Sequence, residues 1–511
     1  MHLVHHFLEY HAEKTPGAVA AIHGEEQRTY AEINREANRV AHMLREFGVK
    51  PGDRVALALE NSIDYISSYY GVLKAGGVTV AQYPNATPKT LKFVLNDCSV
   101  KAVIARERPA QTIASLATEL PDLKAMIVRG NRKNALPETG WALANDKNLA
   151  HMPDENPDLD LIDLARASII YTSGSTGDPR GAILSHLNIV ANTRSIVEYL
   201  ELTAADRIMV VLPFPYVYGK SLLNTHFFAG GSVLLDNRFT FPNAVLKTML
   251  EGEATGFSGV PSTFAILMHK SAVRKFEFPK LRYLTQAGGH MAEPLVREVE
   301  EVFSQQKLFI MYGATEAAAR LAYLEPEMLP QKRGSIGKAI PNVNLRVLND
   351  EGVEVGVGET GELTARGSNM MEGYWNKPEE TANVLDAHGF RTGDLARRDE
   401  DGFFYIVGRK RDMIKSGANR VSAKEVEETL LEYPDVLEAA VIGVEDEILG
   451  EAIHAFVVPK NNAPLAEDEI IVFCRERLLE FKVPRKVIVE TALPKNASGK
   501  LMKEELRKRF A

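Results

Sequence analysis

The sequence predicts an α/β protein with a large N-terminal domain, in which helices cover parallel-rich sheets, and a small C-terminal α+β domain. Three observations carry this prediction. The chain has 511 residues, which is too many for one hydrophobic core. Strand-like and helix-like segments alternate over most of the chain, as parallel sheets covered by helices require. After about residue 400 this alternation gives way to a compact mixture of short strands and helices.

Caps and turns mark the elements of the N-terminal part. Thr29 and Glu32 fit a capping box, and apolar residues at helical spacing follow them as far as Leu44. Gly48 is placed to end this helix. Strand, helix and strand are then expected in turn at residues 54–59, 63–75 and 78–81. Further strands are expected at residues 167–171, 207–212 and 232–235, and a helix at residues 187–200.

The C-terminal part begins after a short strand at residues 403–407 and the polar, basic run GRKRDMIKSG. Helices are expected at residues 423–432 and 467–479, and strands at residues 438–444, 452–459 and 486–490. We expect the boundary near Lys410 and Arg411. It gives an N-terminal domain of residues 1–410 and a C-terminal domain of residues 411–511.

Composition excludes several classes of protein. The net charge is −8, and no basic run predicts binding to nucleic acid or to an anionic membrane. The two cysteines, Cys98 and Cys474, are too few for a disulfide framework or a cysteine-ligated zinc site. The N-terminal residues lack the apolar core of a signal peptide, and no stretch is long and apolar enough to span a bilayer. A cytoplasmic protein, monomeric or homodimeric and without integral membrane contact, is therefore expected.

A glycine-rich segment, YTSGSTGDPRG at residues 171–181, follows the predicted strand 167–171 and precedes a helix expected from about His186. A strand, a glycine-rich loop and a helix in this order hold phosphate, because backbone N–H groups and hydroxyls converge on the anion. Arg180 adds a guanidinium suited to phosphate oxygens. The segment does not match GxxxxGK[ST], so it is not a Walker A loop. From composition alone, a flexible surface turn remains an equal alternative.

Six motifs in one order resemble those of the adenylate-forming superfamily, which comprises acyl- and aryl-CoA synthetases, peptide-synthetase adenylation domains and luciferases. The glycine-rich segment is similar to the signature YTSGSTGxPKG of that superfamily. The other five are MYGATE (311–316), GELTARGSNMMEGYWNKPEET (361–381), FRTGDLA (390–396), GRKRDMIKSGANRVSAKEVE (408–427) and LPKNASGKL (493–501). The resemblance extends from about residue 7 to the end of the sequence.

The resemblance implies a reaction in which a carboxylate attacks the α-phosphorus of ATP, so that pyrophosphate leaves and an acyl-adenylate forms. Thr315 would contact the α-phosphate, and Thr172 and Glu316 would hold Mg²⁺. Asp394 and Arg409 would bind the ribose hydroxyls. The residues implied for the phosphates and the adenine are Thr172, Ser173, Gly174, Ser175, Thr176, Gly177, Arg180, Gly289, His290 and Tyr312. Arg180 stands where this superfamily usually has lysine.

These assignments have structural alternatives. Outside its motif, Glu316 would be read as a member of a structural ion pair, Asp394 as a turn former and His290 as a structural histidine.

Lys500 is the sharpest catalytic candidate that the resemblance supplies. It would neutralise the carboxylate and the α-phosphate while the adenylate forms. The C-terminal domain would then rotate about a hinge at Arg411 and bring Ser416 and Gly417 to a tunnel for the attacking thiol. The small domain is therefore expected to be mobile. The alternative for Lys500 is an ordinary solvated lysine, as most lysines outside such a motif are.

The acyl pocket implied by the resemblance lies around residues 212–221 and 285–320. Val217 stands where amino-acid-activating members carry an aspartate, so α-amino acids are disfavoured. Gly313 stands where acetate-type members carry a large aromatic residue, and it is expected to leave room for a longer or cyclic acid. Arg320 either faces a second carboxylate or points to solvent. The remaining pocket positions are Tyr216, Tyr218, Ser221, Thr285, Ala287, Gly288, Met311, Ala314 and Ala319.

The sequence therefore predicts an AMP-forming acyl- or aryl-CoA synthetase that uses a carboxylic acid, ATP, Mg²⁺ and CoA. One alternative loads the acyl group onto the phosphopantetheine of a carrier protein. A more distant alternative is a non-catalytic nucleotide-binding protein of the same fold, against which Lys500, Glu316 and Asp394 argue. Nothing in the sequence supports a luciferase-like oxygenase.

Overall fold

The computed structural model describes residues 1–130, 134–172, 179–417, 419–447, 449–460, 463–495 and 501–510. The strands of these segments form four sheets, which are called the first to the fourth sheet below. The predicted α/β class is confirmed, because parallel strands with crossover helices make up most of the first and second sheets.

The first sheet runs in the order β16-β15-β14-β13-β12-β10-β11-β1-β2. Its strands are β1 (Val19–His23), β2 (Glu26–Thr29), β10 (Arg207–Val210), β11 (Ser232–Leu235), β12 (Gly256–Gly259), β13 (Tyr283–Gln286), β14 (Lys307–Tyr312), β15 (Ala322–Leu324) and β16 (Lys338–Ala339). The helices between or before these strands are α1 (His6–Lys14), α7 (His186–Tyr199), α8 (Val217–Ala229), α9 (Pro242–Glu251), α10 (Pro261–Lys270) and α11 (Glu293–Val302).

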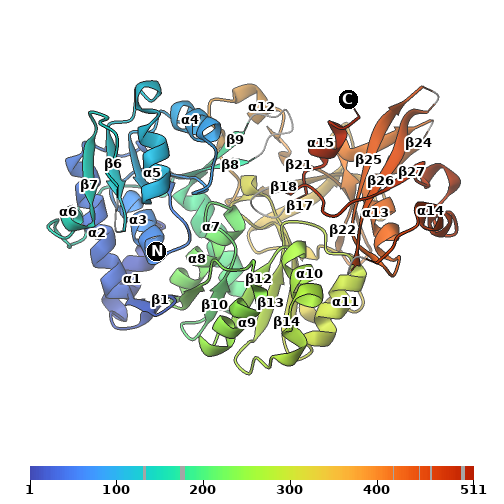
Figure 1. Ribbon diagram of the computed structural model, residues 1–511, viewed down its shortest axis with the longest axis horizontal. Coiled ribbons are helices and arrows are strands. Elements are labelled where there is room, and N and C mark those ends of the chain that lie inside the picture. Colours follow the sequence, from blue (N-terminus) through green and yellow to red (C-terminus); the bar gives the residue numbers. More distant parts are fainter. Residues whose placement is uncertain are drawn as a thin grey trace.

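The second sheet runs in the order β19-β9-β8-β4-β3-β5-β6-β7. Its strands are β3 (Arg54–Ala58), β4 (Val78–Ala81), β5 (Ala102–Ala105), β6 (Ala125–Val128), β7 (Ala142–Asn145), β8 (Arg166–Thr172), β9 (Arg180–Ser185) and β19 (Gly373–Tyr374). Its helices are α2 (Tyr30–Glu46), α3 (Ile63–Lys74), α4 (Pro88–Asp97), α5 (Glu107–Ala114) and α6 (Asp146–Leu149). Figure 1 shows most of these elements on the left, with β8 and β9 nearer the centre, and most of the first sheet with its helices below the centre.

The predicted caps and buried helices hold this part together. The Thr29 hydroxyl accepts a hydrogen bond from the amide of Glu32 at 3.3 Å, and the Glu32 carboxylate accepts one from the Thr29 amide at 2.8 Å. Gly48 has φ of +80°, as expected for a residue that ends a helix. Helix α8 is buried along nearly its whole length and packs against α7, β10, β11 and α1.

The glycine-rich segment was predicted to join a strand to a helix, and this prediction is wrong. Strand β9 follows the segment and pairs antiparallel with β8, with Thr172 opposite Arg180. Helix α7 begins only after β9, with Ser185 as its N-cap. No proline or glycine separates β9 from α7, so the sequence pattern gave no sign of a strand between the loop and the helix.

Of the third sheet, the sequence pattern predicted only the short strand at residues 403–407, which corresponds to β22 (Phe404–Arg409). The strands of this sheet are β17 (Val343–Leu348), β18 (Gly361–Gly367), β20 (Leu385–Asp386), β21 (Gly389–Arg398) and β22, and helix α12 (Pro378–Ala382) precedes β20. All the pairings within it are antiparallel. In Figure 1 this sheet lies between the two large sheets and the C-terminal elements.

The fourth sheet holds the C-terminal elements, at the right of Figure 1. Its strands are β23 (Met413–Ser416), β24 (Asn419–Ser422), β25 (Val436–Asp446), β26 (Gly450–Pro459) and β27 (Lys486–Val489). Its helices are α13 (Ala423–Leu431), α14 (Glu467–Arg475) and α15 (Lys503–Arg507). This is the α+β pattern that the sequence predicts, although α14 ends earlier than expected. A short helical turn, Lys410–Asp412, joins the third sheet to the fourth, and the domain boundary at this turn stays a prediction.

None of the described helices combines the length and the apolar character that a bilayer crossing needs.

Candidate functional site

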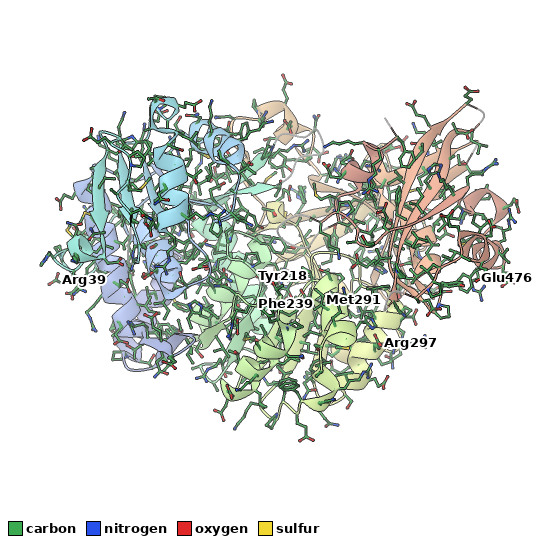
Figure 2. All side chains as sticks on the ribbon, viewed as in Figure 1. Arg39, Tyr218, Phe239, Met291, Arg297 and Glu476 are labelled. Carbon is green, nitrogen blue, oxygen red and sulfur yellow. The ribbon has the colours of Figure 1, made fainter. Side chains whose placement is uncertain are left out.

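One large cavity, of about 1800 Å³, lies where the first, second and third sheets meet the C-terminal elements. Strands β13 and β14 are parallel, and the residues at and just beyond their carboxyl ends line it, among them Gln286, Ala287, Tyr312 and Gly313. Ligands of open parallel sheets bind at such ends. Tyr218 of α8 also lines the cavity, and Figure 2 labels it near the middle of the molecule.

Tyr312, Asp394 and Arg409 form one group in the cavity wall, joined by a hydrogen bond and an ion pair. The Tyr312 hydroxyl donates to Asp394 Oδ2 at 2.5 Å, and Arg409 Nε lies 3.0 Å from Asp394 Oδ1. Asp394 and Arg409 face each other across the β21–β22 pairing, which fixes their spacing. Burial and the Asp394 charge raise the pKa of Tyr312 well above its ordinary value, so the phenol remains a donor. The Asp394 charge also raises the pKa of Arg409, against the opposing effect of burial.

Glu316 and Arg180 come together through Tyr374 of β19. The Tyr374 hydroxyl donates to Glu316 Oε1 at 2.6 Å. The Arg180 guanidinium lies 5.6 Å from the centre of the Tyr374 ring and also forms an ion pair with Glu380 of α12. Burial and the neighbouring Glu316 raise the pKa of Tyr374, which keeps its hydroxyl protonated. Arg180, Glu316 and Thr172 all line the cavity.

His290 connects the large part of the molecule to the C-terminal part. Its Nε2 lies 2.7 Å from Glu428 Oε1 on α13, and Lys424 lies 3.4 Å from the same oxygen. Burial acts to raise the pKa of Glu428, but His290 and Lys424 outweigh that effect and the pKa is lowered. Gly289 and His290 line the cavity as expected. In this arrangement, however, the imidazole is already engaged with a carboxylate.

The acyl side of the cavity is lined by all but two of the predicted pocket residues. Its walls include Tyr216, Val217, Tyr218, Ala287, Gly288, Gly313, Ala314 and Ala319. Ser221 and Thr285 are the exceptions, and both are buried. The Ser221 hydroxyl donates to the Tyr218 carbonyl at 2.7 Å. The Tyr218 hydroxyl and Thr285 Oγ1 lie 2.7 Å apart, which holds the Tyr218 ring in place.

The inference that Gly313 leaves pocket space for a longer acid is not supported by the direction of its missing side chain. A Cβ at Gly313 would lie 1.9 Å from the backbone oxygen of Ala319, and not in open space. The turn that carries this oxygen is unusual, because Ala318 and Ala319 have φ of +53° and +124°. Glycine at 313 is therefore needed for the close approach of this turn. Any side chain there would displace backbone before it filled the acyl pocket.

The remaining predicted site residues have different outcomes. Ser173, Gly174, Ser175, Thr176, Gly177 and Lys500 lie outside the described residues. Lys495 and Leu501, on either side of the Lys500 segment, line the cavity together with Thr315, and so does Arg411. Ser416 and Gly417, predicted for the thiol tunnel, lie on the β23–β24 hairpin and do not line the cavity.

Sequence reasoning missed Tyr374, Glu380 and Glu428 as neighbours of the site. Tyr374 and Glu380 both fall within the motif at residues 361–381, so the motif itself could have indicated them. No local signal identifies Glu428, because its partner His290 is far away in the sequence.

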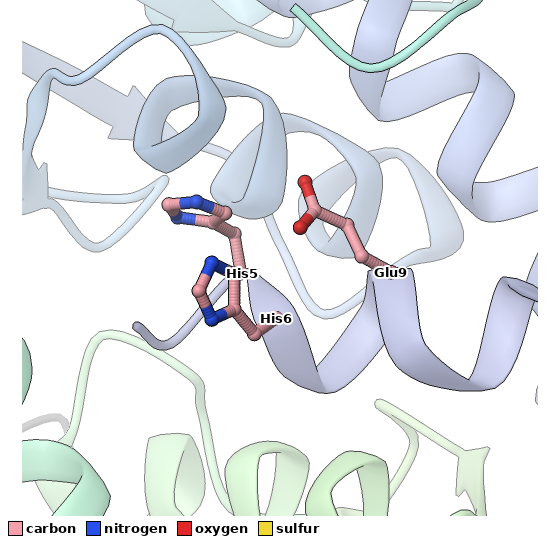
Figure 3. A group of neighbouring side chains, drawn as sticks. All are labelled: His5, His6 and Glu9. Atoms are coloured by element: carbon pink, nitrogen blue, oxygen red, sulfur yellow. The ribbon is translucent and has the colours of Figure 1, made fainter. Parts of the chain in front are cut away.

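A second group of side chains, His5, His6 and Glu9, lies at the start of α1, away from this cavity (Figure 3). Their ligand atoms lie within 4.8 Å of one another, which would suit a metal ion. However, the buried Lys74 ammonium donates to Glu9 Oε1 at 2.7 Å and already neutralises this carboxylate. Burial lowers the pKa of Lys74 to about 8 although Glu9 acts in the opposite direction. The charge of Lys74 would oppose a metal cation, and the group is read as a structural ion pair.

Comparison with known proteins places this geometry in a family. The family model described as AMP-binding enzyme matches residues 8–375. The chain belongs to the AMP-binding enzyme family. The model of the AMP-binding enzyme C-terminal domain matches residues 425–500. The resemblance to the adenylate-forming superfamily is thereby confirmed.

Relatives within the AMP-binding enzyme family match almost the whole chain. A feruloyl-CoA synthase of an Amycolatopsis species is 34% identical over 503 residues, which cover 98% of this chain and 97% of that protein. A long-chain-fatty-acid–CoA ligase of Yersinia pestis is 33% identical over 514 residues, 96% of this chain and 91% of that protein. The crystal structure of an anthranilate CoA ligase in complex with anthranoyl-AMP has a TM-score of 0.91 at 25% identity and covers 99% of this chain and 97% of that one.

The reaction follows from this membership and these relatives. An AMP-binding enzyme of this type activates a carboxylic acid with ATP to an acyl-adenylate, releases pyrophosphate and transfers the acyl group to the thiol of CoA. The prediction of an AMP-forming acyl- or aryl-CoA ligase is confirmed at this level.

Proposed function

We propose that both steps of this reaction take place in the cavity described above, with a carboxylic acid that lacks an α-amino group and with free CoA as the acceptor. One observation supports the proposal above the others. The Tyr312–Asp394–Arg409 group, Glu316 and the acyl-side residues line the same cavity as Lys495 and Leu501 of the C-terminal part. Nucleotide, acid and the residues next to Lys500 would therefore meet in one space.

The nucleotide end of the cavity has the donors and acceptors that ATP requires. Asp394 would accept hydrogen bonds from the ribose hydroxyls while Tyr312 and Arg409 hold it in place. A carboxylate accepts about four hydrogen bonds, so the hydrogen bond from Tyr312 and the ion pair with Arg409 leave room for the ribose. Thr315 would donate to the α-phosphate, and Thr172 and Arg180 would contact the phosphates further along.

The donor set at the phosphate end fits Mg²⁺, a cation that prefers oxygen ligands. Only one oxygen of Glu316 accepts the Tyr374 hydroxyl, which leaves the other for a metal ion, and Thr172 adds a hydroxyl in the same cavity. Bound Mg²⁺ would neutralise phosphate oxygens during attack. Tyr374 would orient the Glu316 carboxylate, and the Glu380 carboxylate would keep the Arg180 side chain in position.

The proposed mechanism has two steps, and in each step one bond forms and another breaks. An oxygen of the acid attacks the α-phosphorus, and the bond between that phosphorus and the pyrophosphate breaks. The CoA sulfur then attacks the acyl carbon, and AMP leaves with the oxygen that came from the acid. Lys500 is proposed to stabilise the negative charge of the first step only, which requires the C-terminal part to move about Arg411 before the second.

The acid end supports an acid without an ammonium group. Val217 is buried in the pocket wall, and an ammonium placed beside it would have no counter-charge from that residue. The names of the relatives include ferulate and long-chain fatty acids, so they do not select one acid for this chain.

Hexanoate and norleucine differ only by the α-amino group and make a matched test. We expect kcat/KM for hexanoate to exceed that for norleucine by about tenfold or more, since an unpaired buried ammonium costs at least about 1.4 kcal/mol. Pyrophosphate exchange measures the first step. Thioester formation, compared with free CoA and with a holo-carrier protein, then identifies the acceptor of the acyl group.

Equal activity with norleucine would contradict the assignment of the acid. If the thioester formed only on the carrier protein, the acceptor would be that protein and not free CoA. If no acid of any kind supported pyrophosphate exchange, the non-catalytic alternative would remain.

A further inference from the structure

Arg320 is a buried cation in the wall of the acyl side of the cavity. It follows the turn at Ala318 and Ala319, and only 2% of its surface is exposed. Its backbone carbonyl accepts hydrogen bonds from the side-chain amides of Asn192 and Asn369, each at 2.9 Å. The backbone of Arg320 is therefore fixed, and the reading that it points to solvent is wrong.

The contacts of the Arg320 guanidinium leave its charge unbalanced. Nε donates to Met311 Sδ at 3.3 Å and Nη1 to the Ala319 carbonyl at 3.1 Å. The guanidinium carbon lies 4.0 Å from the centre of the Tyr218 ring, within range of a cation–π contact. The phenol oxygens of Tyr199 and Tyr218 also interact with the guanidinium. Within the described segments, however, no carboxylate forms an ion pair with Arg320.

A second buried arginine, Arg129, is by contrast balanced by carboxylates. The Arg129 side chain is also only 2% exposed, and it forms ion pairs with Glu36, Asp64 and Asp146. A buried guanidinium without a counter-charge is costly. Arg320 differs from Arg129 in lining the acyl cavity, where a carboxylate of the substrate can supply the missing charge.

We propose that Arg320 binds a second carboxylate on the acid substrate, so that the enzyme selects dicarboxylic acids over monocarboxylic acids of the same length. This inference rests on the proposed function of the cavity. One carboxylate of the substrate reacts with ATP, and the other pairs with the guanidinium of Arg320. The Tyr218 ring and the Met311 sulfur, both in contact with the guanidinium, hold its plane in position for that pairing.

The test compares matched acids on the wild-type enzyme and on Arg320→Met, by pyrophosphate exchange. The pairs are glutarate with pentanoate, adipate with hexanoate, and pimelate with heptanoate. The wild type should favour the diacid of at least one pair by about tenfold or more in kcat/KM, as expected for a buried charged hydrogen bond. Arg320→Met should lower kcat/KM for that diacid by about tenfold or more relative to the monoacid, so that the preference for the diacid is lost.

Arg282→Met is the matched control. Arg282 also lies over a tyrosine ring, that of Tyr283, at 5.0 Å, but it pairs with Asp206 and does not line the cavity. Its replacement should leave the preference for the diacid unchanged. Arg320→Lys, which keeps the charge without the planar fork, should recover part of the preference.

Three outcomes would overturn the proposal. The first is a wild-type preference for the monoacid in every pair, which needs no variant and is independent of whether Arg320→Met folds. The second is an equal loss with both acids in Arg320→Met, which would make Arg320 structural. The third is that no acid of any kind supports pyrophosphate exchange, which would remove the proposed function and this inference with it. Exchange that monoacids support and diacids do not is an extreme form of the first outcome. It would overturn this inference and leave the proposed function standing.

Discussion

Asp394→Ala is expected to raise KM for ATP by about a hundredfold while the protein remains folded. The carboxylate would bind the ribose, and charge-assisted hydrogen bonds of this kind contribute about 1.5–3 kcal/mol each. Its loss also leaves the partly buried Tyr312 hydroxyl without its acceptor and Arg409 without its ion-pair partner. We therefore expect the free energy of unfolding to fall by about 2 kcal/mol. Steady-state kinetics and urea unfolding measure the two effects separately.

Asp399→Ala is the matched control for Asp394→Ala. Asp399 follows strand β21, accepts hydrogen bonds from Lys332 and the Phe403 amide, and does not line the cavity. Its removal should lower stability and leave KM for ATP unchanged. If Asp394→Ala folds and binds ATP as the wild type does, then the Tyr312–Asp394–Arg409 group is structural and the ribose binds elsewhere.

Lys500→Ala is expected to slow adenylate formation by about a hundredfold or more and to leave thioester formation from supplied acyl-adenylate nearly unchanged. Removal of a charge that acts only in one transition state typically costs about 3 kcal/mol in that step. Lys500 itself lies outside the described residues, but Lys495 and Leu501 line the cavity with Thr315. Pyrophosphate release and the conversion of acyl-adenylate with CoA, measured apart, separate the two steps.

Lys508→Ala is the control, because Lys508 follows α15 directly and its exposed side chain pairs with Glu505. It should leave both half-reactions unchanged. An equal loss of both half-reactions in Lys500→Ala would mean that Lys500 is a constant binding contact. The proposed movement about Arg411 would then lose its main support.

The sequence predicted those parts of the fold in which neighbouring residues alone decide the structure. Strand β4, Val78–Ala81, is buried on both faces and lies between clear turns, so its apolar run was sufficient. The capping box at Thr29 was equally local. Strand β9 was missed because it passes into α7 without a glycine or proline between them. Its strand conformation depends on pairing with β8 and β19.

The candidate site was predicted as a set of residues but not as a set of contacts. Its motifs pointed to Tyr312, Glu316 and Asp394, which do line one cavity. The Tyr374–Glu316 hydrogen bond and the His290–Glu428 pair join residues far apart in the chain, and no local pattern encodes them. The direction of a Cβ at Gly313 likewise depends on the turn at Ala319.

The position of a heavy-oxygen label tests the two-step reaction most directly. An active acid is labelled in its carboxylate and supplied with ATP and CoA, and the masses of the products are measured. If the carboxylate attacks the α-phosphorus, one labelled oxygen remains on AMP for each thioester formed, because the thiol breaks the bond between that oxygen and the acyl carbon. Label in inorganic phosphate together with ADP, or AMP that carries no label, would contradict the acyl-adenylate.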